Sequence, residues 1–211
     1  MKSLNAFFPW LEPWVLYCPT PAMQQALRDA AIDFCRDTRV LQVTTAPSPA
    51  VAGQATYDVD LETGTVLSSL ISARYGSRFL RILGNDSADF YEFENPSITG
   101  EPAAASADVG GVIRLYPPPD ATATQQLTFR VALRPTRAAS SLSDVLFEEW
   151  VEAIAAGAAM RLAALPGQPY TQASVVVRAQ QAYAQAKTRA RIQAVKGLNL
   201  TSERVVARAF A

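Results

Sequence analysis

Acidic residues are the main candidates for chemistry in this chain, because the sequence contains no histidine. Histidine is the usual proton acceptor for a serine or cysteine nucleophile and the commonest metal ligand. Asp58 and Asp60 alternate along a predicted strand, which favours a solvated surface over a catalytic pair. Gly110 and Gly111 lead into a predicted strand, whereas a phosphate-binding glycine loop leads into a helix. We therefore predict that the chain is not an enzyme and uses no cofactor or metal.

Two smaller groups could also do chemistry. Cation binding within one predicted loop could use Asp86, Asp89, Glu92 and Glu94. Charged loop residues are more commonly solvated, so we favour that explanation. Cys18 and Cys35 lack metal-ligand spacing, and Cys35 falls in a helical pattern, where cysteine acts as a small hydrophobe. We predict two free thiols.

Two clusters of opposite charge stand near the ends of two predicted helices. The acidic cluster comprises Glu148, Glu149 and Glu152, and the basic cluster comprises Lys187, Arg189 and Arg191. A short turn at residues 166–170 would make the two helices antiparallel and bring the clusters side by side. We predict ion pairs within this hairpin, each contributing about 0.2–1 kcal/mol if exposed. Pairing between subunits and contact with nucleic-acid phosphate are the alternatives.

Apolar residues recur at helical spacing in three segments. The first helix is predicted to have Thr20 as its cap, to begin at Pro21 and to end near Arg39. The second is predicted to begin at a capping pattern in residues 141–144 and to stop at Pro166. The third is predicted to run from about Thr171 to Gly197. The second helix is expected to bury Phe147, Val151, Ile154, Ala158, Leu162 and Leu165. The third is expected to bury Val176, Ala179, Tyr183, Ala186, Ala190 and Ala194.

Short strand patterns separated by turn residues fill the middle of the chain. They cover residues 43–45, 55–59, 66–75, 79–83, 111–116 and 126–133, and residues 85–108 are predicted to form a surface excursion. The sequence thus predicts an α+β fold in which an antiparallel β-sandwich or barrel is inserted into a bundle of N- and C-terminal helices. The predicted domains are a discontinuous bundle (1–39 and 138–197), a β-sandwich (40–137) and an extended tail (198–211).

The first residues form an apolar segment that includes Trp10 and Trp14. Pro9, Glu12 and Pro13 interrupt it well before the ~20 residues that a membrane span requires, so we predict no membrane partner. We expect an extended aromatic arm, which packs either on its own domain or on a neighbouring subunit. Because the formal net charge is zero, no global field indicates nucleic acid or anionic membrane as a partner.

Several stretches resemble the head-to-tail adaptor (connector) proteins of tailed bacteriophages. The matching segments are 9–21, 26–35, 51–58, 100–102, 114–119, 130–135, 146–158 and 165–169. Their order and spacing cover most of the chain, whereas residues 85–97 depart from the family pattern. The resemblance implies a structural virion protein at the head–tail interface, assembled in the host cytoplasm. It implies a ring, typically of 12 subunits, beneath the portal protein, which lets packaged DNA through without tight binding and docks a tail, nozzle or stopper protein.

The resemblance also implies that residues 197–211 insert against the portal. We expect apolar anchoring by Val205, Val206 and Phe210, and pairing of Arg204 and Arg208 with portal carboxylates. A ring requires heterologous contacts, for which the β-module and the aromatic arm are the natural suppliers. The alternative function is a non-enzymatic nucleic-acid-binding module that uses the basic C-terminal helix, and it predicts duplex binding that weakens steeply with salt.

Overall fold

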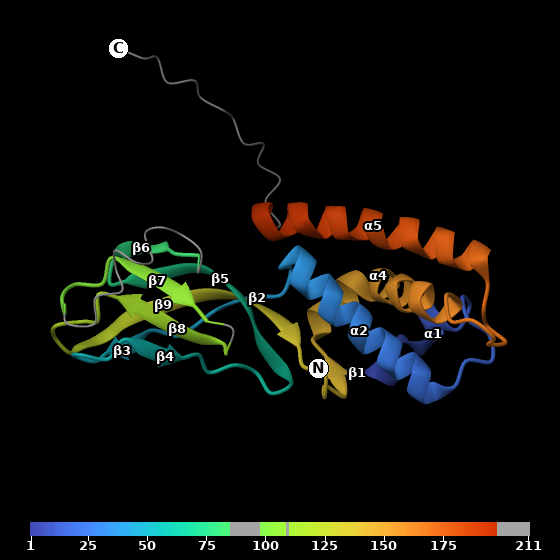
Figure 1. Cartoon of the computed structure of the whole chain (residues 1–211), viewed down its shortest axis with the longest axis horizontal. Coiled ribbons are helices and arrows are strands. Elements are labelled where there is room, and N and C mark those ends of the chain that lie inside the picture. The colour runs from blue at the N-terminus through green and yellow to red at the C-terminus, as the bar shows by residue number, and fades with distance from the viewer. Residues whose placement is uncertain (85–97, 109, 198–211) are drawn as a thin grey trace, which may run out of the picture.

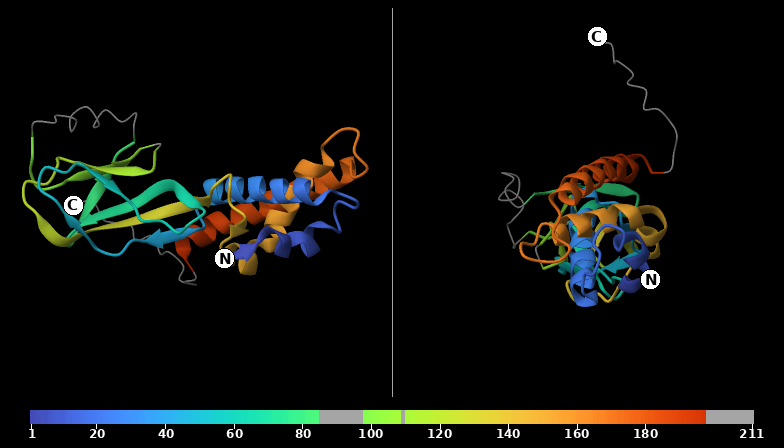
Figure 2. Two further views of the ribbon diagram at one scale, coloured as in Figure 1. Left: turned by 90° about the horizontal axis from the view of Figure 1, so that it is seen from below. Right: turned by 90° about the vertical axis from the view of Figure 1, so that its right-hand side faces the viewer.

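The computed structural model describes residues 1–84, 98–108 and 110–197. The described chain is elongated, with the main helices at one end and a curled β-sheet at the other (Figure 1, Figure 2). We call these ends the helical module and the sheet module. The predicted α+β class is confirmed.

Three long helices build the helical module. They are α2 (Thr20–Thr38), α4 (Asp144–Ala163) and α5 (Ala173–Lys196). Pro19 caps α2, so Thr20 is its first residue and not its cap, and Arg39 ends the helix with a left-handed φ of 54°. The α4–α5 pair is an antiparallel hairpin, as predicted, and α2 packs against both helices through Phe34. Helices from the two ends of the sequence therefore share one core.

Helix α4 is buried on most of its circumference, which corrects the single stripe predicted for it. Leu146, Trp150 and Ala153 are buried, whereas Phe147 and Val151 are only partly buried. Leu165 lies beyond the end of the helix and is exposed. The reason is that α4 packs against α2, α5 and the N-terminal segment at once, and a helix covered on several sides needs no polar face. The stripe of α5 is confirmed at Ala179, Tyr183, Ala186 and Ala190.

The N-terminal aromatic arm is helical and not extended, which corrects the prediction. It consists of a 3-10 turn η1 (Leu4–Phe7) that runs into a short helix α1 (Phe8–Leu11). A two-stranded ladder of β1 (Lys2–Ser3) and β10 (Ser141–Leu142) holds its start beside α4. Burial of Leu4, Phe7 and Leu11 fixes the arm on its own helical module.

Among the described residues, eight strands form the sheet module. They are β2 (Gln42–Thr44), β3 (Ser48–Ala50), β4 (Thr56–Asp58), β5 (Thr65–Tyr75), β6 (Arg78–Ile82), β7 (Ala104–Ala107), β8 (Val112–Tyr116) and β9 (Ala123–Pro135). Their order is β2-β9-β5-β6-β7-β8-β4, and β3 also pairs with β9. The long β9 buries Leu127, Phe129, Val131 and Leu133, as the alternation predicted. Register shifts between β5 and β9 accompany the curl of the sheet.

Two features of the sheet differ from the sequence prediction. Strand β7 lies within residues 85–108, where we expected a surface excursion, and its three alanine and serine positions 104–106 are buried. It also pairs in parallel with β6, so the sheet is mixed and not purely antiparallel. Small residues have low β-propensity, and β7 is a strand because its neighbours β6 and β8 cover both of its edges.

One hydrophobic cluster continues from the helices into the sheet, with α2 packing on β9. The division into domains at residues 39, 138 and 197 stays a prediction. Within the described residues, no helix combines the length and apolar composition that crossing a bilayer would require.

Candidate functional site: an ionic cluster and an aromatic groove

Asp33 is the centre of an ionic cluster that ties the three long helices together. Its Oδ2 accepts hydrogen bonds from Lys187 Nζ at 2.8 Å and Tyr183 Oη at 3.1 Å, both on α5. Arg161 of α4 lies 3.2 Å from the same oxygen. Lys187 also donates to Asp37 at 2.6 Å, one turn further along α2. Each helix thus contributes at least one charged group.

The cluster holds Asp33 in its ionised form. Partial burial opposes ionisation, but the hydrogen bond and charge of Lys187, together with Tyr183 and Arg161, outweigh it and lower the pKa of the carboxyl. Burial and the neighbouring carboxylate raise the pKa of Tyr183, so its hydroxyl remains a donor. Separating the helices would leave the Asp33 carboxylate partly buried without its cationic partners, which costs free energy. The cluster therefore fixes the relative positions of the helices.

A glycine in the middle of α4 lets α5 approach closely. A Cβ placed on Gly157 would lie 2.7 Å from Cε2 of Tyr183, well inside van der Waals contact. The Tyr183 ring therefore packs on bare backbone, and its single hydroxyl hydrogen is shared between the Ala30 carbonyl at 2.9 Å and the Asp33 carboxylate. Arg161 completes the arrangement by donating to the Gly157 carbonyl at 2.7 Å.

The predicted ion pairs between Glu148, Glu149, Glu152 and Lys187, Arg189, Arg191 are not formed among the described residues. Lys187 pairs with α2 instead, and Arg191 donates through Nε to the Asp37 carbonyl at 3.2 Å. Glu149 accepts from Gln193 at 2.6 Å, so the predicted helix ends do meet, through an amide. The hairpin is formed as predicted, but Lys187 and Arg191 are engaged by α2, which the pairing prediction left out. Pairing of these clusters between subunits stays a prediction.

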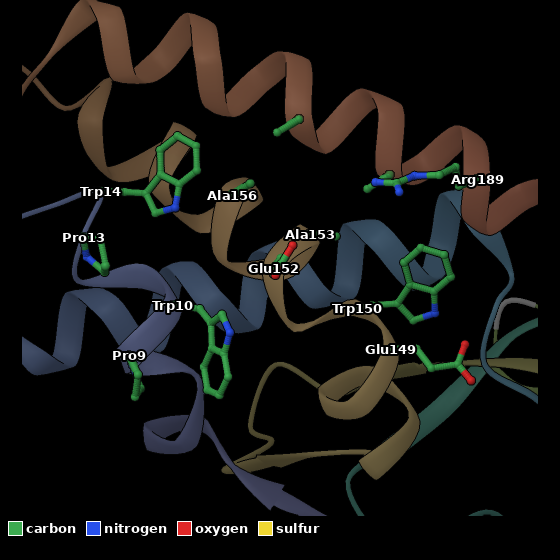
Figure 3. A pocket seen from close by; sticks show the side chains of 12 residues that line it. Pro9, Trp10, Pro13, Trp14, Glu149, Trp150, Glu152, Ala153, Ala156 and Arg189 are labelled. Carbon is green, nitrogen blue, oxygen red and sulfur yellow. The ribbon is translucent and has the colours of Figure 1, made fainter.

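An elongated groove of about 440 Å³ lies between the arm, α4 and α5. Figure 3 shows Trp10 and Trp14 of the arm on one side, and Trp150 of α4 on the other with Arg189 of α5 above it. We call this the aromatic groove. Its wider lining includes Pro9, Pro13, Glu149, Glu152, Ala153, Ala156, Ala182 and Ala186. The small alanine side chains leave room beside the indole rings, and Glu149 and Glu152 add two carboxylates to the lining.

The predicted aromatic residues lie in this groove and pack on their own chain. The Trp10 ring meets Phe147 edge-on at 5.4 Å, and the Arg178 guanidinium stands 5.2 Å above the Trp14 ring. Trp10 nevertheless remains 36% exposed, so its outer surface is open to another molecule. The indole nitrogen of Trp150 is enclosed and has no hydrogen-bond partner in the described chain.

Other predicted site residues have different outcomes. The residues that we expect to dock on the portal lie outside the described residues; they are Arg204, Val205, Val206, Arg208 and Phe210. The acidic loop at 86–94 also lies outside the described residues. Both cysteines are free thiols, as predicted, and burial raises the pKa of Cys35 to about 12.

Sequence reasoning missed Asp33, Arg161, Tyr183 and Gly157 as one unit. Charged side chains are normally exposed, whereas the Asp33 side chain is only 21% exposed. The available signal was a tyrosine in the buried stripe of α5 facing an alanine-rich helix with a single glycine. A buried tyrosine hydroxyl needs a polar partner, which an acidic residue on another helix supplies.

Comparison with protein families identifies the class. The chain matches the SU10 adaptor protein family over residues 5–208, which is nearly its whole length, and it belongs to that family. It is thus a structural protein of a bacteriophage virion, an adaptor at the head–tail interface that associates with portal and tail components. No curated protein matches the chain.

Proposed function

We propose that this adaptor assembles as a ring beneath the portal, continues the DNA channel towards the tail and gives tail components a docking surface. Family membership over residues 5–208 carries the proposal. A ring of about 12 subunits is expected from the family, with assembly in the host cytoplasm. The domain division at residues 39, 138 and 197 belongs to the same proposal.

The helical module has the rigidity that such a ring requires. The Asp33 cluster and the Gly157–Tyr183 contact fix three helices, so a subunit can present two constant faces to its neighbours. The sheet module offers exposed apolar side chains on β6, with Phe79 67% and Ile82 38% exposed. These side chains support the sheet module as one supplier of subunit contacts.

The C-terminal segment is the proposed portal contact, with Val205, Val206 and Phe210 as anchors and Arg204 and Arg208 as partners for portal carboxylates. Docking of a peptide segment costs conformational entropy, which apolar anchors offset.

The alternative of duplex binding by the end of α5 has less support. Lys187 is engaged by two carboxylates, and the guanidinium of Arg191 donates to a backbone carbonyl, so these two cations are partly neutralised or occupied. Zero net charge also suits a channel that must release DNA.

Electron microscopy of the protein mixed with its portal tests the proposal. We expect rings stacked on the portal for the unchanged chain and loss of stacking for the double variant Val205→Asp, Phe210→Asp. Thr201→Ala is the matched control in the same segment and should leave the rings in place. Absence of any ring on the portal, together with duplex binding that weakens steeply with salt, would establish the nucleic-acid function instead.

A further inference from the structure

The aromatic groove contains every tryptophan of the chain, since the three tryptophans are Trp10, Trp14 and Trp150. Tryptophan, proline and alanine make up most of its lining, so most of its surface is apolar. Grooves of this kind take extended or helical peptide segments with large apolar anchors.

Two charged side chains in the groove have no partner among the described residues. Glu152 on α4 and Arg189 on α5 line it, and neither makes an ion pair or hydrogen bond within the described chain (Figure 3). An occupant that brings an arginine beside Glu152 would therefore gain an interaction without breaking one. Large apolar side chains and at least one cation are the chemistry that the groove selects.

The end of α5 lies beside a hollow that borders this groove. A second, smaller hollow is lined by Gly197, Gln193 and Val145, and it shares Glu149 with the aromatic groove. Gly197 is where the C-terminal segment 198–211 begins. A chain that continues from Gly197 thus starts beside a surface that leads directly into the groove.

We propose that in the free adaptor the chain's own segment 198–211 folds back and docks in the aromatic groove. Its composition fits, since Val205, Val206 and Phe210 are apolar anchors and Arg204 and Arg208 are cations. Arginine 204 pairs with Glu152, and Phe210 packs against the open surface of Trp10.

The segment is long enough to reach along the whole groove. Among the α5 residues that line the groove, Ala182 is the farthest from Gly197, and α5 advances about 22 Å between them at 1.5 Å per residue. An extended chain covers about 3.3 Å per residue, so fewer than ten residues span that distance. The remaining residues can turn the chain at Gly197, whose φ of 63° already departs from the helix.

The docking goes beyond the proposed ring and does not depend on it, because it concerns the chain before any partner binds. If the same segment also inserts against the portal, the groove and the portal compete for it. The groove would then keep apolar anchors covered in the free protein and release them on the portal, where uncovered anchors would otherwise favour self-association.

Tryptophan fluorescence of the full-length chain tests the docking, because each indole reports on the groove. Phe210→Ala and Arg204→Glu should each shift the emission to longer wavelength and increase quenching by acrylamide severalfold. Glu152→Arg should do the same, and combining Arg204→Glu with Glu152→Arg should restore protection. Asp120→Lys, an exposed charge change in the sheet module, should leave the emission unchanged.

Three results would overturn the proposal. Emission and quenching that are identical in the unchanged chain, Phe210→Ala and Arg204→Glu would mean that the segment does not occupy the groove. Protection that disappears on dilution would assign the groove to a second copy. If the double variant Arg204→Glu, Glu152→Arg does not regain protection from acrylamide, Glu152 is not the partner of Arg204. None of these results bears on ring formation with the portal, which microscopy measures separately.

Discussion

The helical and sheet modules differ in how far their ion pairs are exposed to solvent. In the helical module, Asp33 lies between helices and is held by cations from two of them. In the sheet module, the described ion pair Arg78–Glu101 spans 3.8 Å between side chains that are 55% and 61% exposed. The first arrangement depends on packing and constrains it, whereas the second is open to water and contributes little.

Apolar residues show the same contrast. Tyr183 is buried against the Gly157 backbone, while Phe79 on β6 stands 67% exposed under the Arg74 guanidinium at 4.9 Å. Tyr183 thus helps to hold the helical module together, whereas Phe79 is available to a partner. A substitution of Tyr183 should therefore cost folding stability, and a substitution of Phe79 should cost partner binding.

Asp33→Ala should have the largest effect. It leaves Lys187 and Arg161 without their shared carboxylate, and we expect a loss of about 3 kcal/mol in the free energy of unfolding, measured by urea denaturation. Asp58→Ala removes an exposed carboxylate from β4 and is the matched control, with a change within about 0.5 kcal/mol. Equal effects of the two substitutions would remove the contrast between the modules.

Gly157→Ala should have the next largest effect. Overpacking against Tyr183 costs about 1–3 kcal/mol, and the better helix propensity of alanine returns up to about 1 kcal/mol. We expect a net loss of about 1–2 kcal/mol by denaturation. Gly110→Ala is the control, since a Cβ there meets nothing within 4 Å. A stabilised Gly157→Ala variant would show that the ring can move aside freely.

The stability contributed by Asp33 should depend on pH. Its folded pKa lies below the usual 3.8, so the contribution is fully present above that value and is lost as the pH falls through the folded pKa. Unfolding free energies of the unchanged chain and Asp33→Asn should therefore converge as the pH is lowered from neutral into this acidic range. Parallel curves would mean that the carboxyl titrates normally.

Phe79→Ser should have the smallest effect on stability, within about 0.5 kcal/mol, because the ring is exposed and its cation–π contact is weak. Leu80→Ser, on the buried side of the same strand, should cost about 3 kcal/mol. If β6 supplies a subunit contact, Phe79→Ser should also reduce ring formation in microscopy. Unchanged rings would remove β6 from the interface.

Periodicity made much of the fold predictable. The α5 stripe at Ala179, Tyr183 and Ala186 and the alternation of β9 were visible because each residue's environment follows from its position on one regular element. Strand β7 was not visible, because alanine and serine carry no strand pattern and only pairing with β6 and β8 makes them a strand.

The sequence by itself determined the α+β class, the helix hairpin and the absence of histidine chemistry, because these depend on composition and on spacing along the chain. Only the tertiary structure decided that Lys187 pairs with Asp33 and Asp37, that Gly157 admits Tyr183, and that all three tryptophans converge on one groove. Each of these arrangements joins residues from different helices, and Lys187 is 154 positions from Asp33 along the chain. Their energies depend on the angle and distance between helices, which no local pattern encodes.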